Sequence, residues 1–556
     1  MIRHAQPAVS VDPFDPRGVP GRSPVEPAPR RGGAGSGPLL LVDNGKLGAG
    51  YGPYAVIADV LRETIAGDWR LYANDLLRVG DDAIDPIAEQ LAQQLGEPAA
   101  PRAAVLALAD AGVSVQTALL AMALERRGVP TVVLATPLGA RVVEAIYAAR
   151  APELSLVAID TVRTDTQARL RELLAAVLPA IRAAMTERPR AAATSVAKAT
   201  AATAAAAVAA EQRRVWSAAA EAMAEFQHWA TASGIGDGLP LMPPSDGAIR
   251  DLLASVPDDP GDIIYGPAVT SGRSLRVHDA AVNAVMAGCA PAGFPVVLAA
   301  LRAVARPGYR LSQAAITTHP SGNAIVFAGG DPRRYGMASG AGCLGPGASG
   351  NPAIGRAVSL AIQHVFGARP GGADLSAFGS PAELTYCLAE SADDNPWPSL
   401  ARDFGDGSPG VRVTKAEAPR NVREHLAMTP RGSCEALAGA ATSICSNNAY
   451  IPGDLLVFVN PEHAAILAEA GWGRTDVAEA IHALARLPRA RLEGRCIGPI
   501  RPRSMDVLEQ LPVTRSPRDV HVVVAGGRSP QSMVALPWGY SRSQWQPIAT
   551  AKGGAA

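Results

Sequence analysis

Short apolar runs alternate with helix-like segments through the first third of the chain, and this alternation limits the possible folds. Four such runs are bounded by turn residues, at 39–45, 103–110, 130–136 and 155–160. Segments with helical spacing separate them, such as AVIADVLRETI at 55–65. Strands that alternate with helices predict a parallel sheet with right-handed crossovers. We therefore expect a Rossmann-like α/β domain over residues 38–185.

Composition divides the rest of the chain. Residues 1–37 are rich in Pro, Gly and Arg and are expected to be disordered. Residues 186–215 are rich in alanine without an amphipathic face, which indicates a linker. Residues 216–556 again contain strand and helix candidates and predict a larger mixed α/β domain. No repeat of fixed period is found. The 556 residues are in any case too many for one hydrophobic core.

The net charge and the cysteine content of the chain limit its expected binding partners and its expected cellular compartment. The 51 basic and 51 acidic residues give a formal net charge of +0, so no overall field attracts nucleic acid or an anionic membrane. A small-molecule substrate is favoured instead. We find neither a signal-peptide core nor a run of roughly 18 apolar residues that could span a membrane. The six cysteines form no CxxC pair and indicate reduced thiols, so a cytoplasmic protein is expected.

Three blocks of the first domain resemble segments of a known protein family. They are Val42–Lys46, the strand that ends at Asp110, and Leu124–Thr131. Over residues 38 to 165 the chain resembles the UGSC family of bacterial selenoproteins and their cysteine forms. That family is similar to part of component B of the glycine, sarcosine and betaine reductases. The resemblance implies an oxidoreductase with thiol- or selenol-dependent chemistry. The reactive group of the family lies in a strand-to-helix turn, where the helix dipole favours a thiolate.

The redox motif of that family is absent from this chain. Counting back from Leu124 places Asp110 at the first motif position and Val113 where the second cysteine belongs. A carboxylate and a valine cannot exchange disulfides, so we expect this domain to keep the fold without the redox pair. Asp110 still ends a strand of a parallel sheet, where ligands bind, and is a candidate substrate-binding residue. A helix N-cap or turn residue is the alternative.

The second domain resembles bacterial proteins that carry UGSC-type domains, through the blocks NAVMAGC and GPGASGNPAIGRA and through Asn-Pro-Trp and Ala-Gly-Gly elements. This resemblance implies no known reaction, so the candidate residues rest on their own chemistry. The segment RVHDAAVNAVMAGC places His278 on a helix and Cys289 at the exit of that helix. Cys289 needs a basic partner to be reactive, and a buried inert thiol is the alternative.

The most concentrated glycine stretch runs from Ser339 to Asn351. Its glycines permit positive φ and can present backbone N–H groups to an anionic or carbonyl-bearing ligand. Cys343 lies in this loop ahead of a helix, a position that favours a lowered thiol pKa. The candidate substrate-binding residues here are Gly345, Gly347, Asn351 and Arg356. A solvated surface position is the alternative for Arg356.

These residues favour an enzyme that acts on a small polar or anionic metabolite in the C-terminal domain. In this hypothesis Cys343 or Cys289 is the nucleophile, and His278 or His319 is the general base. One alternative is a non-catalytic binding or assembly protein whose cysteines are core residues. Another is a metal-dependent lyase or hydratase that uses histidines with Glu390, although the sequence contains no recognisable set of metal ligands. The sequence does not identify a cofactor, and a homo-oligomer or a redox partner protein is compatible with it.

Overall fold

The computed structural model describes residues 16, 25–30, 38–45, 47, 54, 56–74, 76, 79–95, 103–110, 113–161, 165–187, 220–347, 350–370, 372–424, 429–493, 495 and 508–549. Of the linker predicted at 186–215, only the first two residues belong to these ranges.

Five parallel strands form the sheet of the first domain, in the order β2-β1-β3-β4-β5. They are β1 (Pro38–Asp43), β2 (Asp68–Ala73), β3 (Ala103–Ala109), β4 (Thr131–Ala135) and β5 (Ser155–Ala158). Leu39 and Leu41 of β1 pack against one layer of helices, and Leu40 and Val42 against the other. This is the side-chain alternation of a strand buried on both faces. The predicted parallel sheet is confirmed.

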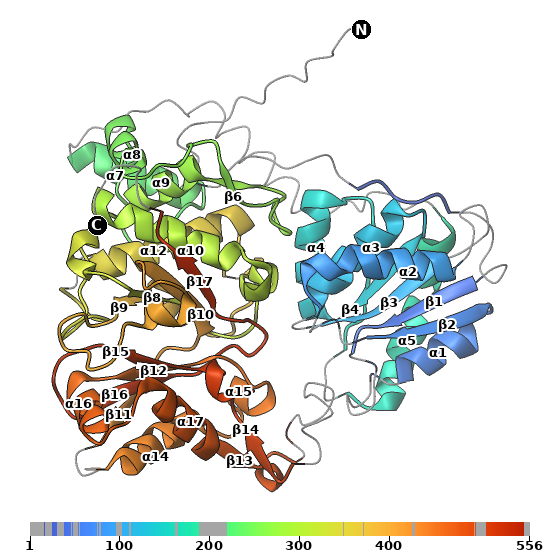
Figure 1. Ribbon diagram of the computed structural model, residues 1–556. Helices are drawn as coiled ribbons and strands as arrows, with labels where there is room; N and C mark the ends of the chain where they lie inside the picture. The colour runs from blue at the N-terminus through green and yellow to red at the C-terminus, as the bar shows by residue number, and fades with distance from the viewer. Residues whose placement is uncertain are drawn as a thin grey trace.

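Helices cover both faces of this sheet (Figure 1). One layer contains α1 (Val56–Thr64) and α5 (Gln167–Thr186), and the other contains α2 (Ile84–Gln94), α3 (Ser114–Arg126) and α4 (Pro137–Arg150). Part of the N-terminal segment that we expect to be disordered also packs here. Arg30 forms a buried ion pair with Glu125, with 2.9 Å between Nη2 and Oε1. The same carboxylate accepts a hydrogen bond from the backbone N–H of Ala28.

The C-terminal domain contains two four-stranded mixed sheets, in the orders β17-β10-β8-β9 and β11-β16-β12-β15. The first consists of β8 (Gly322–Ala328), β9 (Cys387–Ala389), β10 (Gly410–Ala416) and β17 (Gln544–Pro547). The second consists of β11 (Arg420–Arg423), β12 (Leu455–Val459), β15 (Val520–Val524) and β16 (Gln531–Ala535). One inner strand of each sheet, β8 or β12, is parallel to one neighbour and antiparallel to the other. The edge strand on the far side, β17 or β11, is antiparallel to its neighbour. The mixed α/β prediction is confirmed.

The two sheets belong to a structural duplication. The first half runs α10 (Phe294–Ala305), β8, α12 (Gly350–Phe366), β9 and β10, and the second runs α14 (Pro430–Ala441), β12, α17 (Arg474–Leu484), β15 and β16. The last strand of each half is exchanged. β11 follows β10 along the chain but pairs with β16, whereas β17 follows β16 but pairs with β10.

The segment that leads from β10 to β11 and the segment that leads from β16 to β17 pass each other and pair. Ala416 pairs with Pro537 in an antiparallel bridge. The N–H of Glu417 donates to the carbonyl of Leu536 at 2.8 Å, and the N–H of Trp538 donates to the carbonyl of Lys415 at 2.9 Å. These two hydrogen bonds are equivalent under a local two-fold axis. The strand registers agree, since the first residue of β17 pairs with Val413 and the first residue of β11 pairs with Val534. Position 415 of the first half therefore corresponds to position 536 of the second.

The C-terminal domain has helices on both outer faces of the two stacked sheets (Figure 1). Apolar residues of β8 and β12, such as Val326 and Phe458, fill the space between the sheets. The remaining helices are α7 (Ala220–Ala232), α8 (Asp246–Leu253), α9 (Val277–Met286), α11 (Leu311–Ala314), α13 (Pro381–Leu384), α15 (Asn447–Tyr450) and α16 (Pro461–Glu469). Two short strand pairs, β6 (Ile263–Tyr265) with β7 (Leu275–Arg276) and β13 (Arg486–Pro488) with β14 (Gln510–Pro512), complete the fold. None of the helices in the described ranges combines the length and apolar character needed to cross a membrane.

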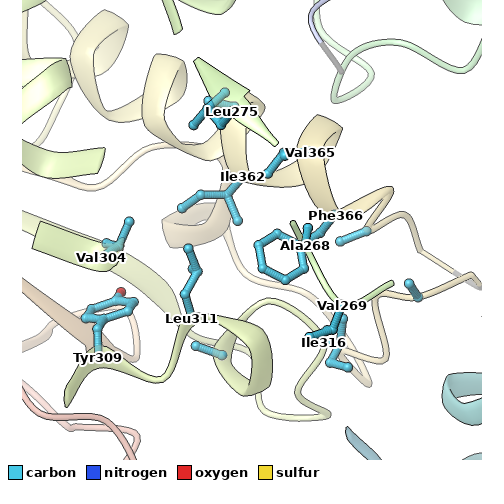
Figure 2. Packing of buried hydrophobic residues seen from close by; sticks show 14 of the residues in the cluster. Ala268, Val269, Leu275, Val304, Tyr309, Leu311, Ile316, Ile362, Val365 and Phe366 are labelled. Atoms are coloured by element: carbon cyan, nitrogen blue, oxygen red, sulfur yellow. The ribbon is translucent and has the colours of Figure 1, made fainter. Parts of the chain in front are cut away.

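Apolar packing supports the region around α11 and α12. Figure 2 shows Leu311, Ile316 and Ile362 among the buried side chains that gather there. The two domains also meet near α11, where the Ser312 hydroxyl donates a hydrogen bond to Asp81 of the first domain. Burial at this contact raises the pKa of Asp81, despite the hydrogen bonds that act in the opposite direction.

Candidate active site

A polar cavity lies in the C-terminal domain beside α12, α13 and the strands β8 and β10. Its volume is about 100 Å³. Small side chains line part of it, and the polar or ionisable lining residues include His319, Asn323, Gln363, Asp374, Glu383 and Lys415. A larger hollow of about 560 Å³ adjoins it and extends to residues 234–238. The two lie side by side, since both are lined by Ser359, Gln363, Ala368, Asp374 and Glu383.

Lys415 is the central cation of the smaller cavity. It is the last residue but one of β10, and strand alternation places it on the same face as Val411 and Val413, which pack under the helices. Its side chain lines the cavity although the residue is only 7% exposed. In the described part of the chain, no hydrogen bond or ion pair of its ammonium group is found. Burial lowers the pKa of Lys415 to about 8, although the charges of Glu383 and Asp374 act in the opposite direction.

Glu383 and Asp374 supply the acidic groups of the cavity. Glu383 lies in the first turn of α13, where it accepts hydrogen bonds from the Ser376 hydroxyl at 3.0 Å and the Ser380 N–H at 3.1 Å. Burial raises the pKa of Glu383, even though these hydrogen bonds and the charge of Lys415 oppose it. Asp374 accepts a hydrogen bond from the N–H of Ser376 at 2.9 Å. The cavity thus combines a lysine of lowered pKa with a carboxyl group of raised pKa.

His319, which the sequence suggests as a general base, lines the same cavity. Its Nε2 atom lies 3.1 Å from Oε1 of Glu417. Burial would raise the pKa of Glu417, but His319 and Arg420 lower it. The Nδ1 atom of His319 is buried and has no partner among the described residues. Asn323, beside Lys415 in the sheet, accepts a hydrogen bond from the Tyr309 hydroxyl at 2.6 Å.

The duplicated half provides a comparison within the same molecule. Leu536 occupies the position that corresponds to Lys415 and is fully buried in the apolar core of the second half. Glu417 corresponds to Trp538 in the same way. The fold therefore accepts an apolar residue at this strand position, and the architecture alone does not require a lysine.

The predicted nucleophiles lie outside this cavity. Cys343 is 6% exposed. Burial raises its pKa, and the backbone N–H groups of Gly526, Cys343 and Leu344 oppose the shift. Burial also raises the pKa of Cys289 to about 12. Cys387 interacts electrostatically with both thiols, so the structure brings three cysteines near one another. In the described residues no hydrogen bond joins Cys343 or Cys289 to His278 or His319.

The other predicted binding residues hold the loops together. Asn351 donates hydrogen bonds to the carbonyl groups of Ala338 at 2.7 Å and Cys343 at 2.8 Å, so it clamps the glycine-rich loop. Within that loop the N–H of Gly345 donates to Gly342, and Gly347 has a φ of 95°.

Arg356 forms a two-pronged ion pair with Asp237, at 2.8 and 2.9 Å. It also donates to the carbonyl groups of Leu239 and Pro240. Arg356 therefore fixes the segment that walls the larger hollow.

Asp110 follows β3 at the point where the strand order of the first sheet reverses, between β1 and β3. In open α/β sheets this is the usual position of a ligand crevice. The Asp110 carboxylate is buried and accepts a hydrogen bond from the Thr136 hydroxyl at 3.0 Å, and its carbonyl accepts one from Ser114. Val113, at the second position of the redox motif, is buried at the start of α3.

Glu390, the carboxylate of the metal-dependent alternative, is fully engaged. It accepts hydrogen bonds from the Ser399 hydroxyl at 2.6 Å, from the N–H of Leu400 and from Arg474 at 2.8 Å. Across the described ranges, no group of three His, Cys, Asp or Glu side chains could hold a metal ion.

No motif in the sequence marks Lys415, Glu383 or Asp374 as residues of a site. One signal in the sequence points to Lys415: the chain contains only four lysines, at positions 46, 198, 415 and 552, among 51 lysines and arginines. A chain that uses arginine for nearly every cationic position but keeps a lysine in a buried strand indicates a role that arginine cannot fill.

Comparison of the sequence with models of known protein families gives no match, and comparison with curated proteins gives none either.

Proposed function

We propose that this chain is an enzyme that acts on a small polar metabolite, with Lys415 as its reacting amine. The observation that carries the proposal is the buried ammonium group of Lys415, which faces a polar cavity without a partner among the described residues. Burying an unpaired charge costs free energy. The equivalent Leu536 avoids this cost, so a lysine at position 415 is best explained by chemistry.

The cavity contains the groups that acid–base chemistry needs. A lysine whose pKa is lowered to about 8 supplies free amine near neutral pH. Glu383, whose pKa is raised by burial, keeps its proton to a higher pH than an ordinary glutamate. Environments that move the pKa values of an amine and a carboxyl group toward neutrality are typical of catalytic pairs. In this proposal Lys415 takes a proton or attacks the substrate, and Glu383 returns a proton.

Competitive labelling with trace acetic anhydride tests this proposal without a known substrate. Because only the free amine reacts, the pH dependence of labelling gives the pKa of each lysine separately. We expect Lys415 to titrate near 8, well below the ordinary lysine value of about 10.4. Lys415→Arg should remove only the low-pKa component, whereas Lys552→Arg should leave it. A Lys415 that titrates together with the other lysines would refute the proposal.

A second candidate function is thiol chemistry at Cys343. The three backbone N–H groups beside its sulfur are the observation that favours it, since such donors stabilise a thiolate. We expect iodoacetamide to modify Cys343 faster than the buried thiols of Cys289 and Cys387, while the exposed Cys445 reacts independently. Peptide mapping of wild type and Cys343→Ser identifies the fast site. Slow and uniform modification of all buried thiols would instead favour a binding or assembly protein with cysteines in its core.

A further inference from the structure

The size and the charges of the cavity indicate which bond Lys415 forms and which class of compound binds there. The smaller hollow, about 100 Å³, has room for a carbonyl group but not for a large ligand, and Lys415 lines it. Gly322 at the start of β8 makes this arrangement possible. A Cβ atom at this glycine would lie 1.9 Å from the carbonyl oxygen of Ala382, so a side chain there would push α13 and its Glu383 away.

We propose that Lys415 forms an imine with the carbonyl carbon of an uncharged, hydroxylated aldehyde or ketone, whose remaining atoms occupy the larger hollow. This inference rests on the proposed function, because it requires Lys415 to be the reacting amine. It adds that the amine acts as a nucleophile, and it names the class of substrate.

Proton transfer in this step is supplied by residues of the cavity. Lys415 enters this step as the free amine, its proton having passed to solvent, and its nitrogen attacks the carbonyl carbon. The electron pair of the C=O bond moves to oxygen, which takes a proton from Glu383. A further proton passes from nitrogen to this oxygen through Glu383, the C–O bond breaks, and water leaves. The free amine, the carbonyl compound and the proton of Glu383 thus become a protonated imine and water, Glu383 is left ionised, and no oxidant or other reactant is consumed.

The charges around the two hollows favour a neutral substrate. In the state that reacts, Lys415 is a free amine and Glu383 carries its proton, so the charges that remain are one positive charge on Arg369 and one negative charge on Asp374. Asp237 is already neutralised by its ion pair with Arg356. The remaining polar groups, such as Ser359 and Gln363, are neutral donors and acceptors suited to hydroxyl groups. A balanced set of charges gives little net attraction to an anion.

Borohydride trapping tests the imine directly. The full chain is incubated with glyceraldehyde, dihydroxyacetone or, as the anionic comparison, pyruvate, and sodium borohydride then reduces any imine to a stable amine. Peptide mapping by mass spectrometry reads each of the four lysines separately. At pH 7 the lowered pKa gives Lys415 roughly 200-fold more free amine than an ordinary lysine. We therefore expect the hydroxylated compounds to modify Lys415 well before the other lysines.

Controls separate the possible results. Lys415→Arg should abolish the fast adduct, and Lys552→Arg should retain it. Faster trapping with pyruvate than with both hydroxylated compounds would overturn the substrate class. No adduct at Lys415 would overturn the nucleophilic role, and if acetic anhydride labelling still places the pKa of Lys415 near 8, the proposed function survives this failure. A Lys415 that titrates as an ordinary lysine would remove both proposals together.

Discussion

Replacing Lys415 by leucine is expected to stabilise the protein by about 3 kcal/mol at pH 7 while it removes the reacting amine. The pKa of this lysine falls from 10.5 to about 8 on folding. Each unit of such a shift destabilises the folded state by about 1.4 kcal/mol when the lysine is charged. Leucine carries no charge and already occupies the equivalent position 536 in the second half. The same substitution should abolish labelling and trapping at position 415.

The gain in stability should depend on pH in a defined direction. The folded chain releases the proton of Lys415 above about pH 8, and the unfolded chain holds it until about pH 10.5. Between these values the unfolded state binds more protons, so the stability of the wild type rises with pH relative to the leucine variant. The full difference should be present below pH 8 and should disappear toward pH 10.5.

Urea unfolding at several pH values measures this difference. Lys415→Arg is the matched control, because arginine stays charged over the whole range and should give no gain. A leucine variant that is less stable than the wild type at every pH would show that Lys415 stabilises the fold instead of destabilising it.

Acidification is expected to weaken the protein through His521, a buried residue between the two sheets. The Nη2 atom of Arg412 lies 2.6 Å from the Nε2 atom of His521. Burial and the charge of Arg412 lower the pKa of His521 to about 4, although Asp454 acts in the opposite direction. A histidine with the ordinary pKa of 6.5 in the unfolded chain gains its proton first in that state. Stability should therefore fall by about 3 kcal/mol between pH 6.5 and pH 4.

This pH window separates His521 from its acidic neighbour. Burial would raise the pKa of Asp454, but the hydrogen bond and charge of His521 and the charges of Arg515 and Arg542 lower it. The stabilisation by Asp454 is therefore lost only below the ordinary aspartate pKa of 3.8. His521→Gln keeps an acceptor for Arg412 and does not titrate, so its urea midpoint should stay nearly level from pH 6.5 to pH 4. An equal decline in wild type and variant would assign the acid sensitivity to other groups.

The sequence predicts those strands whose residues are buried on both faces. β3 and β4 are continuous apolar runs, and the structure confirms them. β2 (DWRLYA) is missed because it lies at the edge of the sheet and keeps exposed and charged residues, so it gives no apolar run. The duplication also leaves no repeat in the sequence, since packing constrains only which positions are apolar. Even this apolar pattern differs between the halves, because Lys415 lies at the position equivalent to Leu536.

The sequence predicts only part of the cavity. His319 is named in advance, but Lys415 and Glu383 reach it from elements far apart in the chain that are joined by no motif. Arg356 is predicted to bind substrate from its position on a helix that follows a glycine-rich loop. Its guanidinium instead meets Asp237, 119 residues earlier in the chain. A spacing rule within one segment cannot anticipate such a partner.

The exchange of β11 and β17 has a consequence for the order in which the protein can be built. During synthesis the ribosome releases β8, β9 and β10 before the second half of the C-terminal domain, but the edge of β10 stays uncovered until residues 544–547 have been made. The nascent chain must therefore hold an open sheet edge, a template for wrong pairing between molecules, through the synthesis of the whole second half. A chain cut after β16 would keep almost all of its residues and still lack the strand that completes the first sheet of the C-terminal domain.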